Sequence, residues 1–214
     1  MIFSITSEDN KALGEFFKNS VVYLKKYFRL KQYFGINWEF NLPVLFVVKD
    51  LAIKKHAFGT SAPKWLKGWC GRQNEIFVLS PQLIYQEEGI KFTPKKYRAL
   101  IKHELIHLFY SCITKNIKPR WLNEGLCQYL SGQLEWKKEH KTFSLFLSFF
   151  EETGAEIYIE SGWAVKYLVD KFGKDKLLKL FKEIRGKSFN RKEFAKIFES
   201  VYEAKLNYKF FNQI

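Results

Sequence analysis

The residues best suited to chemistry are His103, Glu104 and His107, in the stretch His-Glu-Leu-Ile-His. Residues four positions apart lie on the same face of a helix. Both imidazoles can therefore occupy corners of one tetrahedral zinc site. The carboxylate that follows the first histidine can reach a water molecule at the metal. The spacing predicts a Zn²⁺ cofactor and hydrolytic chemistry in which Glu104 is the general base.

A catalytic zinc ion usually has three protein ligands and a water molecule, so the two histidines need a further partner. Glu124 is the candidate. A second helix is expected at residues 121–130, after a short connection, and it can pack beside the first helix. A carboxylate early on this second helix would then face the histidines. The predicted metal ligands are His103, His107 and Glu124.

The helix that carries both histidines has a clear start. Thr93 can cap its N-terminus, and Pro94 suits its first position. At about 100° per residue, one side of this helix is apolar and the histidines lie on the opposite side. The apolar side holds Ile101, Leu105, Leu108 and Cys112. Histidines that only pack in the core would be expected among these apolar residues.

The surrounding elements follow from hydrophobic periodicity and from breaks at glycine and proline. Before the histidine helix we expect a long helix from Ser7 to about Gly35, a buried strand at 42–48, an irregular segment at 50–64, a β-hairpin at 65–79 with its turn at 72–74, and a linker or short helix at 82–92. After it we expect helices at 121–130, 140–152, 157–172, 174–185 and 190–204.

These elements predict one α+β domain over residues 1–214, in which a small mixed or antiparallel sheet packs on a mainly helical core. Its parts are an N-terminal helix at 1–35, the sheet at 40–80, the metal-binding helices at 93–136 and a helical C-terminal part at 140–214. The chain is 47% hydrophobic and 18% aromatic, which is enough for a large core. This aromatic content excludes a disordered chain.

The net charge and the cysteines limit the classes of protein to which the chain can belong. The net charge of +14 is spread along the chain, and it indicates either an anionic partner such as nucleic acid or a lysine-rich solvated surface. Cys70, Cys112 and Cys127 are far apart and form no C-x-x-C, which argues against a disulfide scaffold. We find neither a membrane-spanning apolar run nor a signal peptide, so we expect a cytoplasmic protein.

The stretch Trp-Leu-Asn-Glu-Gly-Leu at 121–126, paired with His-Glu-Leu-Ile-His at 103–107, resembles the zinc motifs of gluzincin metallopeptidases. It is most similar to the peptidase MA-like group, and more distantly to the aminopeptidase branch that contains leukotriene A4 hydrolase. The resemblance covers roughly residues 40–185. It implies a zincin-like fold and a zinc-dependent peptidase that acts on a peptide or protein. It also implies that an edge strand near residues 69–79 binds the substrate backbone.

The same resemblance implies a role for Tyr158. In the aminopeptidase branch, a tyrosine near the start of a later helix supports the oxyanion of the transition state. Tyr158 stands four positions before Gly162, one more than the aminopeptidase spacing. His140, Tyr129 and Tyr167 are alternatives for this role.

Other interpretations stay open at this point. The chain could keep its zinc site without catalysis, as a binding protein whose basic surface docks nucleic acid or another anion. The histidines could also be packing residues. Asn123 could contact a metal ligand or cap a helix. No anchor for a free amine is evident, which favours an endopeptidase. The sequence defines neither the substrate nor the oligomeric state.

Overall fold

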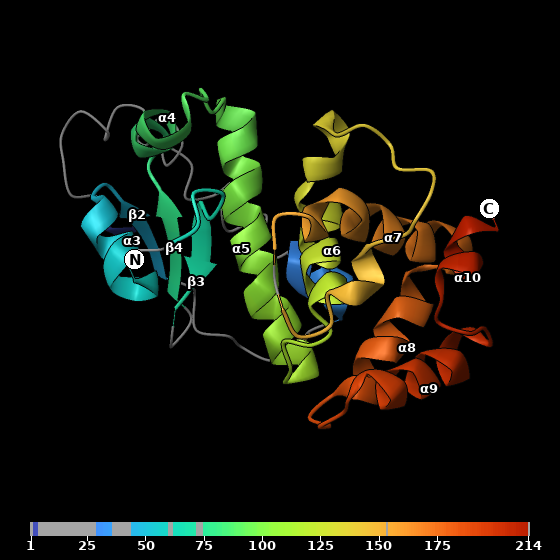
Figure 1. Ribbon diagram of the computed structural model, residues 1–214. Helices are drawn as coiled ribbons and strands as arrows, with labels where there is room; N and C mark the ends of the chain where they lie inside the picture. The colour runs from blue at the N-terminus through green and yellow to red at the C-terminus, as the bar shows by residue number, and fades with distance from the viewer. Residues whose placement is uncertain are drawn as a thin grey trace. The chain divides into compact units, whose positions relative to one another are not determined.

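The computed structural model describes residues 2–3, 29–35, 44–59, 62–71, 75–152 and 154–213. The chain divides into two compact units, Met1–Leu105 and Ile106–Ile214. The boundary falls inside helix α5 (Pro94–Thr114), which carries both histidines. Figure 1 shows a small sheet in the first unit and helices in the second. The predicted α+β class with a small mixed sheet is confirmed.

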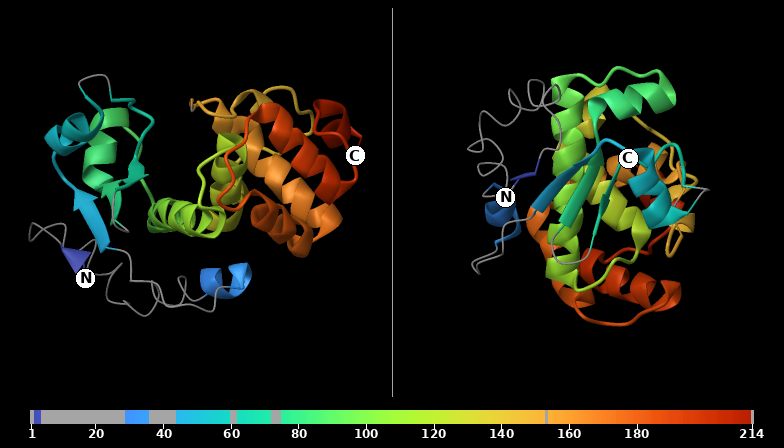
Figure 2. Two further views of the ribbon diagram at one scale, coloured as in Figure 1. Left: turned by 90° about the horizontal axis from the view of Figure 1, so that it is seen from below. Right: turned by 90° about the vertical axis from the view of Figure 1, so that its left-hand side faces the viewer.

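The sheet has the strand order β1-β2-β4-β3. Its strands are β1 (Ile2–Phe3), β2 (Val44–Val48), β3 (Gly68–Cys70) and β4 (Glu75–Leu79). Strands β1, β2 and β4 are parallel, while β3 runs antiparallel to β4. The views of Figure 2 show these strands side by side. The predicted strand at 42–48 and the hairpin are confirmed in their described residues, and the turn at 72–74 lies outside them.

A row of aromatic side chains crosses one face of the sheet. Phe46, Phe77 and Trp69 are register partners on β2, β4 and β3. Their rings stack in sequence, with centroids 4.8 Å apart for the first pair and 5.3 Å apart for the second. Their neighbours Leu45 and Ile76 point to the opposite, buried face, as the alternation of a strand requires. Cross-strand stacking of this kind fixes the register of the short strand β3.

The prediction of an irregular segment at 50–64 is wrong in its first half. Residues Leu51–Phe58 form helix α3, which begins where the Asp50 side chain accepts a hydrogen bond from the backbone of Ala52 at 2.8 Å. Lys54 on this helix is buried and pairs with Glu87 at 3.1 Å. The helix has a weak apolar stripe because one of its inward positions is this paired lysine. Hydrophobic periodicity could therefore not reveal it.

Helix α4 (Pro81–Glu88) confirms the alternative of a short helix at 82–92. Ser80 caps it by accepting from the backbone of Leu83 at 3.1 Å. The start of α5 is also confirmed, since Oγ1 of Thr93 accepts from the backbone of Lys96 at 3.3 Å.

The predicted division of α5 into one core face and one histidine face is only partly correct. Ile101 and Leu105 are buried, but Leu108 and Cys112 are half-exposed. Residues on other sides of the helix are buried as well, among them Ile106, Phe109 and Tyr110. Helix α5 is enclosed on most of its circumference, so its histidines also lie in a largely buried environment.

The second unit is helical. Its elements are α6 (Arg120–Ser131), η1 (Gln133–Trp136), η2 (Phe146–Ser148), α7 (Ile157–Phe172), α8 (Lys174–Ile184), α9 (Arg191–Tyr202) and α10 (Tyr208–Asn212). The predicted helices at 121–130, 157–172, 174–185 and 190–204 are confirmed within one or two residues. The short helix α10 was not predicted.

The predicted helix at 140–152 is wrong. This segment is irregular and contains one turn of 3-10 helix, η2. The backbone N–H groups of Ser144, Leu145 and Phe146 all donate to the carboxylate of Glu160. These bonds replace the backbone bonds that a helix would make, and a distant carboxylate is not visible in local periodicity.

Only the end of the predicted N-terminal helix lies in the described residues. Residues 29–34 are helical, and Gly35 follows with a φ of 63°. The remainder of that prediction, from Ser7 onward, lies outside the described residues. Among the helices that are described, none has the length and apolar character needed to cross a membrane.

Candidate metal centre

Helices α5 and α6 bring His107 and Asn123 together. Nδ1 of His107 lies 2.8 Å from Oδ1 of Asn123. Nδ2 of Asn123 donates to the backbone carbonyl of Ile117 at 3.4 Å, which identifies the end of the amide that is oxygen. Because that oxygen only accepts, Nδ1 of His107 is the donor. Once Nε2 gives up its own proton, a histidine held in this way presents the lone pair of Nε2, which is the atom that a metal ion would bind.

Glu124 faces this second nitrogen. Its Oε2 lies 3.4 Å from Nε2 of His107. Two ligands at ~2.0–2.1 Å from one zinc ion, in tetrahedral geometry, stand about 3.3 Å apart. The observed separation thus fits two ligands of a single ion. Both side chains are sheltered, with exposed fractions of 15% for His107 and 6% for Glu124.

Cys127 contacts the other side of the same imidazole. Its Sγ lies 3.3 Å from Nδ1 of His107 and 3.8 Å from Oδ1 of Asn123. Asn123 and Cys127 are one helical turn apart on α6, so both reach the same nitrogen. The sequence indicated no role for Cys127, which is completely buried.

The surroundings of His107 favour the positively charged form of its imidazole. Burial lowers the pKa of His107, but negative charge on Cys127 and Glu124, with the hydrogen bonds to both, raises it further than burial lowers it. The pKa of His107 consequently lies well above the usual histidine value. A metal ion that binds at Nε2 must displace the proton on that nitrogen, so metal binding should release protons to the solvent.

His103 stands one turn before His107 on α5 and is buried. His103, His107 and Cys127 each offer one ligand atom, and these atoms lie within 4.8 Å of one another. Two residues therefore compete as the third ligand, the Glu124 carboxylate at Nε2 and the Cys127 thiol at Nδ1. The bond from Nδ1 to Asn123 favours Glu124, because it leaves Nε2 for the metal.

Glu104, the predicted general base, lies against strand β3. A Cβ added at Gly68 would stand 2.7 Å from Oε1 of Glu104. The thiol of Cys70 donates to the backbone carbonyl of Glu104 at 3.3 Å. Gly68 is thus the residue that allows the strand to pass so close to the carboxylate. Among the described strands, β3 stands at the end of the sheet order, where an extended peptide could add to its outer edge.

Gly125, next to Glu124, has a packing role. A Cβ at this position would collide with the backbone carbonyl of Ser161 and stand 2.7 Å from Cγ2 of Val165, both on α7. The glycine therefore lets α7 pack directly on α6. This close packing fixes the helix that carries Asn123 and Glu124.

Tyr158, the predicted oxyanion donor, lies in the first turn of α7 beside Lys137. Nζ of Lys137 is 5.8 Å from the ring centroid of Tyr158 and 3.4 Å from its backbone carbonyl. It also donates to Oε1 of Gln128, one turn after Glu124 on α6. Burial lowers the pKa of Lys137 to about 8. A catalytic role for Tyr158 stays a prediction.

The alternatives to Tyr158 lie in the second unit. His140 contacts Glu160 at 3.2 Å. Tyr167 packs on Phe211, with ring centroids 5.8 Å apart. Tyr129 is half-buried on α6, and burial raises its pKa.

Sequence reasoning missed Cys127 and Gly68. Cys127 could have been found, since it lies four positions after Asn123 on a predicted helix and must share its face. Gly68 could not, because its contact with Glu104 joins two elements that are 36 residues apart in the chain.

Comparisons of the chain with models of protein families, with curated proteins and with solved structures find no match. The function of the chain must consequently be inferred from its residues and their geometry.

Proposed function

We propose that the chain is a zinc-dependent peptidase that hydrolyses peptide bonds in a peptide or protein. The observation that carries the proposal is the arrangement at His107. Asn123 holds Nδ1 of the imidazole, and Glu124 stands 3.4 Å from Nε2. That arrangement suits a catalytic zinc ion, in which a histidine nitrogen and a carboxylate oxygen are neighbouring ligands.

In this proposal His103, His107 and Glu124 hold the ion. When bound, zinc would polarise the scissile carbonyl and lower the pKa of water. Glu104 would take a proton from the attacking water and deliver it to the nitrogen of the leaving amine. The burial of Glu104, which is 4% exposed, keeps its carboxylate away from bulk solvent.

The substrate would bind as an extended chain along strand β3. Gly68 and Cys70 hold this strand against Glu104, so a peptide paired with its outer edge would pass near the general base. Tyr158 is the predicted donor to the oxyanion.

The experiment compares wild type with Glu104→Gln. Both proteins are loaded with zinc and incubated with a mixture of unstructured peptides, and cleavage is followed by mass spectrometry. We expect the variant to cleave about 10²- to 10⁴-fold more slowly, with unchanged zinc content. Glu199→Gln, an exposed change on α9, is the matched control and should cleave like wild type. Equal cleavage by Glu104→Gln, or none by zinc-loaded wild type, would reject the proposal.

A binding protein with a structural metal is the second candidate, because Cys127 offers a thiol beside His107. Three histidine and cysteine ligands could close such a site without catalysis. The net charge of +14 would then serve to dock nucleic acid or another anionic partner. This candidate predicts nucleic-acid binding that weakens steeply as salt is raised. A flat salt response, or no binding at physiological salt, would reject it.

A further inference from the structure

A cavity of about 620 Å³ lies within the second unit, and none of the candidate metal ligands lines it. Its wall is built from the segment around His140, from one side of α7 and from Phe211 of α10. A volume of this size suits a ligand of small-molecule dimensions.

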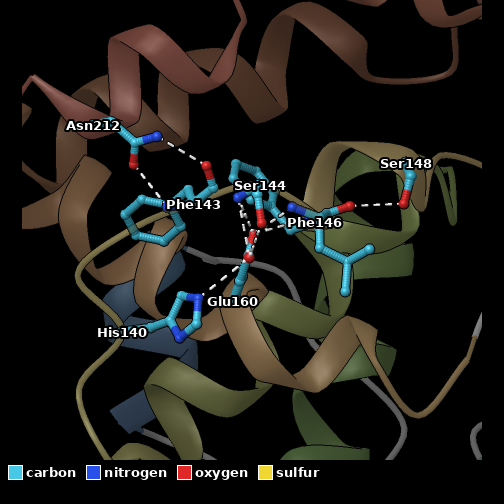
Figure 3. Close-up of polar contacts among 8 residues, drawn as sticks. His140, Phe143, Ser144, Phe146, Ser148, Glu160 and Asn212 are labelled. Carbon is cyan, nitrogen blue, oxygen red and sulfur yellow. Dashed lines mark hydrogen bonds and ion pairs between the residues drawn. The ribbon is translucent and has the colours of Figure 1, made fainter.

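One polar group in the wall is held in a fixed orientation. Nε2 of His140 lies 3.2 Å from Oε1 of Glu160, which is buried. The same carboxylate accepts from the backbone of Ser144, Leu145 and Phe146. Figure 3 shows Ser144 and Phe146 beside the Glu160 carboxylate. Although burial raises the pKa of Glu160, these bonds and the charge of His140 lower it further, so it is ionised at neutral pH. The His140 ring is bound to Glu160 along one edge, and the residue lines the cavity.

The apolar part of the wall is aromatic, and its rings contact one another. Phe143 and Phe211 lie with ring centroids 5.8 Å apart, and Tyr167 lies 5.8 Å from Phe211. Asn212 fixes the backbone of Phe143 on both sides, because its side chain accepts from the N–H at 2.7 Å and donates to the carbonyl at 2.9 Å. The half-buried Trp163 completes this surface. Rigid aromatic walls of this kind favour a flat ring, which can stack on them.

The charged part of the wall has more cations than anions. Three lysines line the cavity, against the carboxylates of Glu139 and Asp170. Asp170 already pairs with Lys166 on the same helix. Lys171 is held over the ring of Tyr167, with Nζ 5.4 Å from the centroid, so one cation lies beside the aromatic surface. The third lysine, Lys141, adjoins His140 in the chain. This balance favours an anionic group over a cationic one.

We propose that this cavity binds a small ligand in which a planar ring is joined to an anionic group. The ring lies against Trp163 and the phenylalanines. The anion lies among His140, Lys141 and Lys171, where the ammonium groups of the two lysines can donate charge-assisted hydrogen bonds beside the imidazole that Glu160 fixes. Carboxylate and phosphate share this chemistry, and the test separates them.

The test is calorimetric titration of the chain of residues 1–214 with five probes. Phenyl phosphate and phenylacetate carry both a ring and an anion. Benzyl alcohol carries only the ring, and inorganic phosphate and acetate carry only the anion. We expect at least one ring-bearing anion to bind ten or more times tighter than benzyl alcohol and its own parent anion. Tighter binding of phenyl phosphate identifies a phosphate ligand, and tighter binding of phenylacetate identifies a carboxylate. No preference over the parent compounds overturns the proposal.

Variants locate the binding. Lys171→Gln and His140→Gln should each weaken it about fivefold or more, as the loss of a charge-assisted contact predicts. Lys196→Gln, an exposed lysine on α9 outside the cavity, is the matched control and should bind like wild type. Lys171 is exposed, so its replacement leaves the fold intact. Wild-type affinity in Lys171→Gln overturns the proposal. Loss of binding in Glu124→Ala also overturns it, because that result would place the anion at the metal ligands.

Discussion

Two glutamate–histidine pairs can be compared within the described part of residues 106–214. Glu124 lies 3.4 Å from His107, and Glu160 lies 3.2 Å from His140. Both carboxylates are almost inaccessible, at 6% and 4% exposed. In each pair the glutamate faces Nε2 of the imidazole. The pairs differ in the other contacts that hold the two partners.

In the Glu160 pair the additional contacts are on the carboxylate. Three consecutive backbone N–H groups, of Ser144, Leu145 and Phe146, donate to it at 2.8–3.1 Å. In the Glu124 pair the additional contacts shown are on the imidazole, where Asn123 and Cys127 lie at Nδ1. The same two residue types organise a loop in the Glu160 pair, and in the Glu124 pair they stand where the proposed metal ion would bind. The role of each pair depends on whether the additional contacts are made by the carboxylate or by the imidazole.

The largest effect on stability is expected from Glu160→Gln. The amide nitrogen of glutamine would face backbone N–H groups, donor against donor, and the charge-assisted bonds would be lost. We expect the free energy of unfolding to fall by about 3 kcal/mol, as measured by urea denaturation. Metal content should stay at the wild-type level, because Glu160 belongs to the structural pair. Loss of metal with full stability would reverse the assignment of the two pairs.

The lowered pKa of Glu160 adds a pH signature to this prediction. A carboxylate whose pKa is lower in the folded state stabilises the protein above its unfolded pKa. This stabilisation is lost as the pH falls through the folded pKa. Wild type should therefore lose stability below about pH 4, and Glu160→Gln should lose less over the same interval. Identical acid sensitivity in both proteins would contradict this account of Glu160.

A smaller effect, on zinc affinity, is expected from Asn123→Ala, which removes the hydrogen bond between Asn123 and Nδ1 of His107. Without that acceptor the imidazole can change tautomer or rotate. Zinc affinity should consequently fall by about 10- to 100-fold, as measured by competition with a chelating dye. Asn123→Asp keeps an oxygen acceptor for Nδ1 and should retain most of the affinity. Wild-type zinc affinity in Asn123→Ala would show that the hydrogen bond to Asn123 does not orient His107 as a metal ligand.

The smallest of these effects concerns the first unit, where Gly68 touches Glu104. In Gly68→Ala the new methyl would stand 2.7 Å from Oε1 of Glu104 and displace the carboxylate. Peptide cleavage should fall about tenfold, while zinc content stays constant. Gly71→Ala, whose Cβ meets Glu75 and Phe77 instead, is the control and should cleave faster than Gly68→Ala. An unchanged rate of peptide cleavage in Gly68→Ala would show that the close approach of β3 to Glu104 does not matter for catalysis.

Local signals in the sequence were enough for much of the fold. Thr93 and Pro94 marked the start of α5, and the regular spacing of apolar residues located α7, α8 and α9. The errors occurred where distant polar residues determine the structure. The segment 140–152 is irregular because Glu160 binds its backbone. Helix α3 was missed because its buried residue is Lys54, paired with Glu87.

The candidate site shows the same limit. The spacing of His103, Glu104 and His107 on one helix, followed by Glu124, was evident from the sequence. The orientation of the His107 ring was not, because it depends on which side of α6 faces α5. That side carries Asn123 and Cys127 as well as Glu124. Helical spacing places Cys127 on the same face as Asn123, but only the structure shows that its thiol reaches the His107 ring.

The central claim is that Glu124, and not Cys127, completes the metal site with His103 and His107. Native mass spectrometry of zinc-loaded wild type, Glu124→Ala and Cys127→Ser tests it most directly, with circular dichroism to verify that each protein is folded. We expect one zinc ion per chain in wild type and in Cys127→Ser, and loss of the ion from Glu124→Ala. Retention of zinc by folded Glu124→Ala together with its loss from Cys127→Ser would contradict the claim.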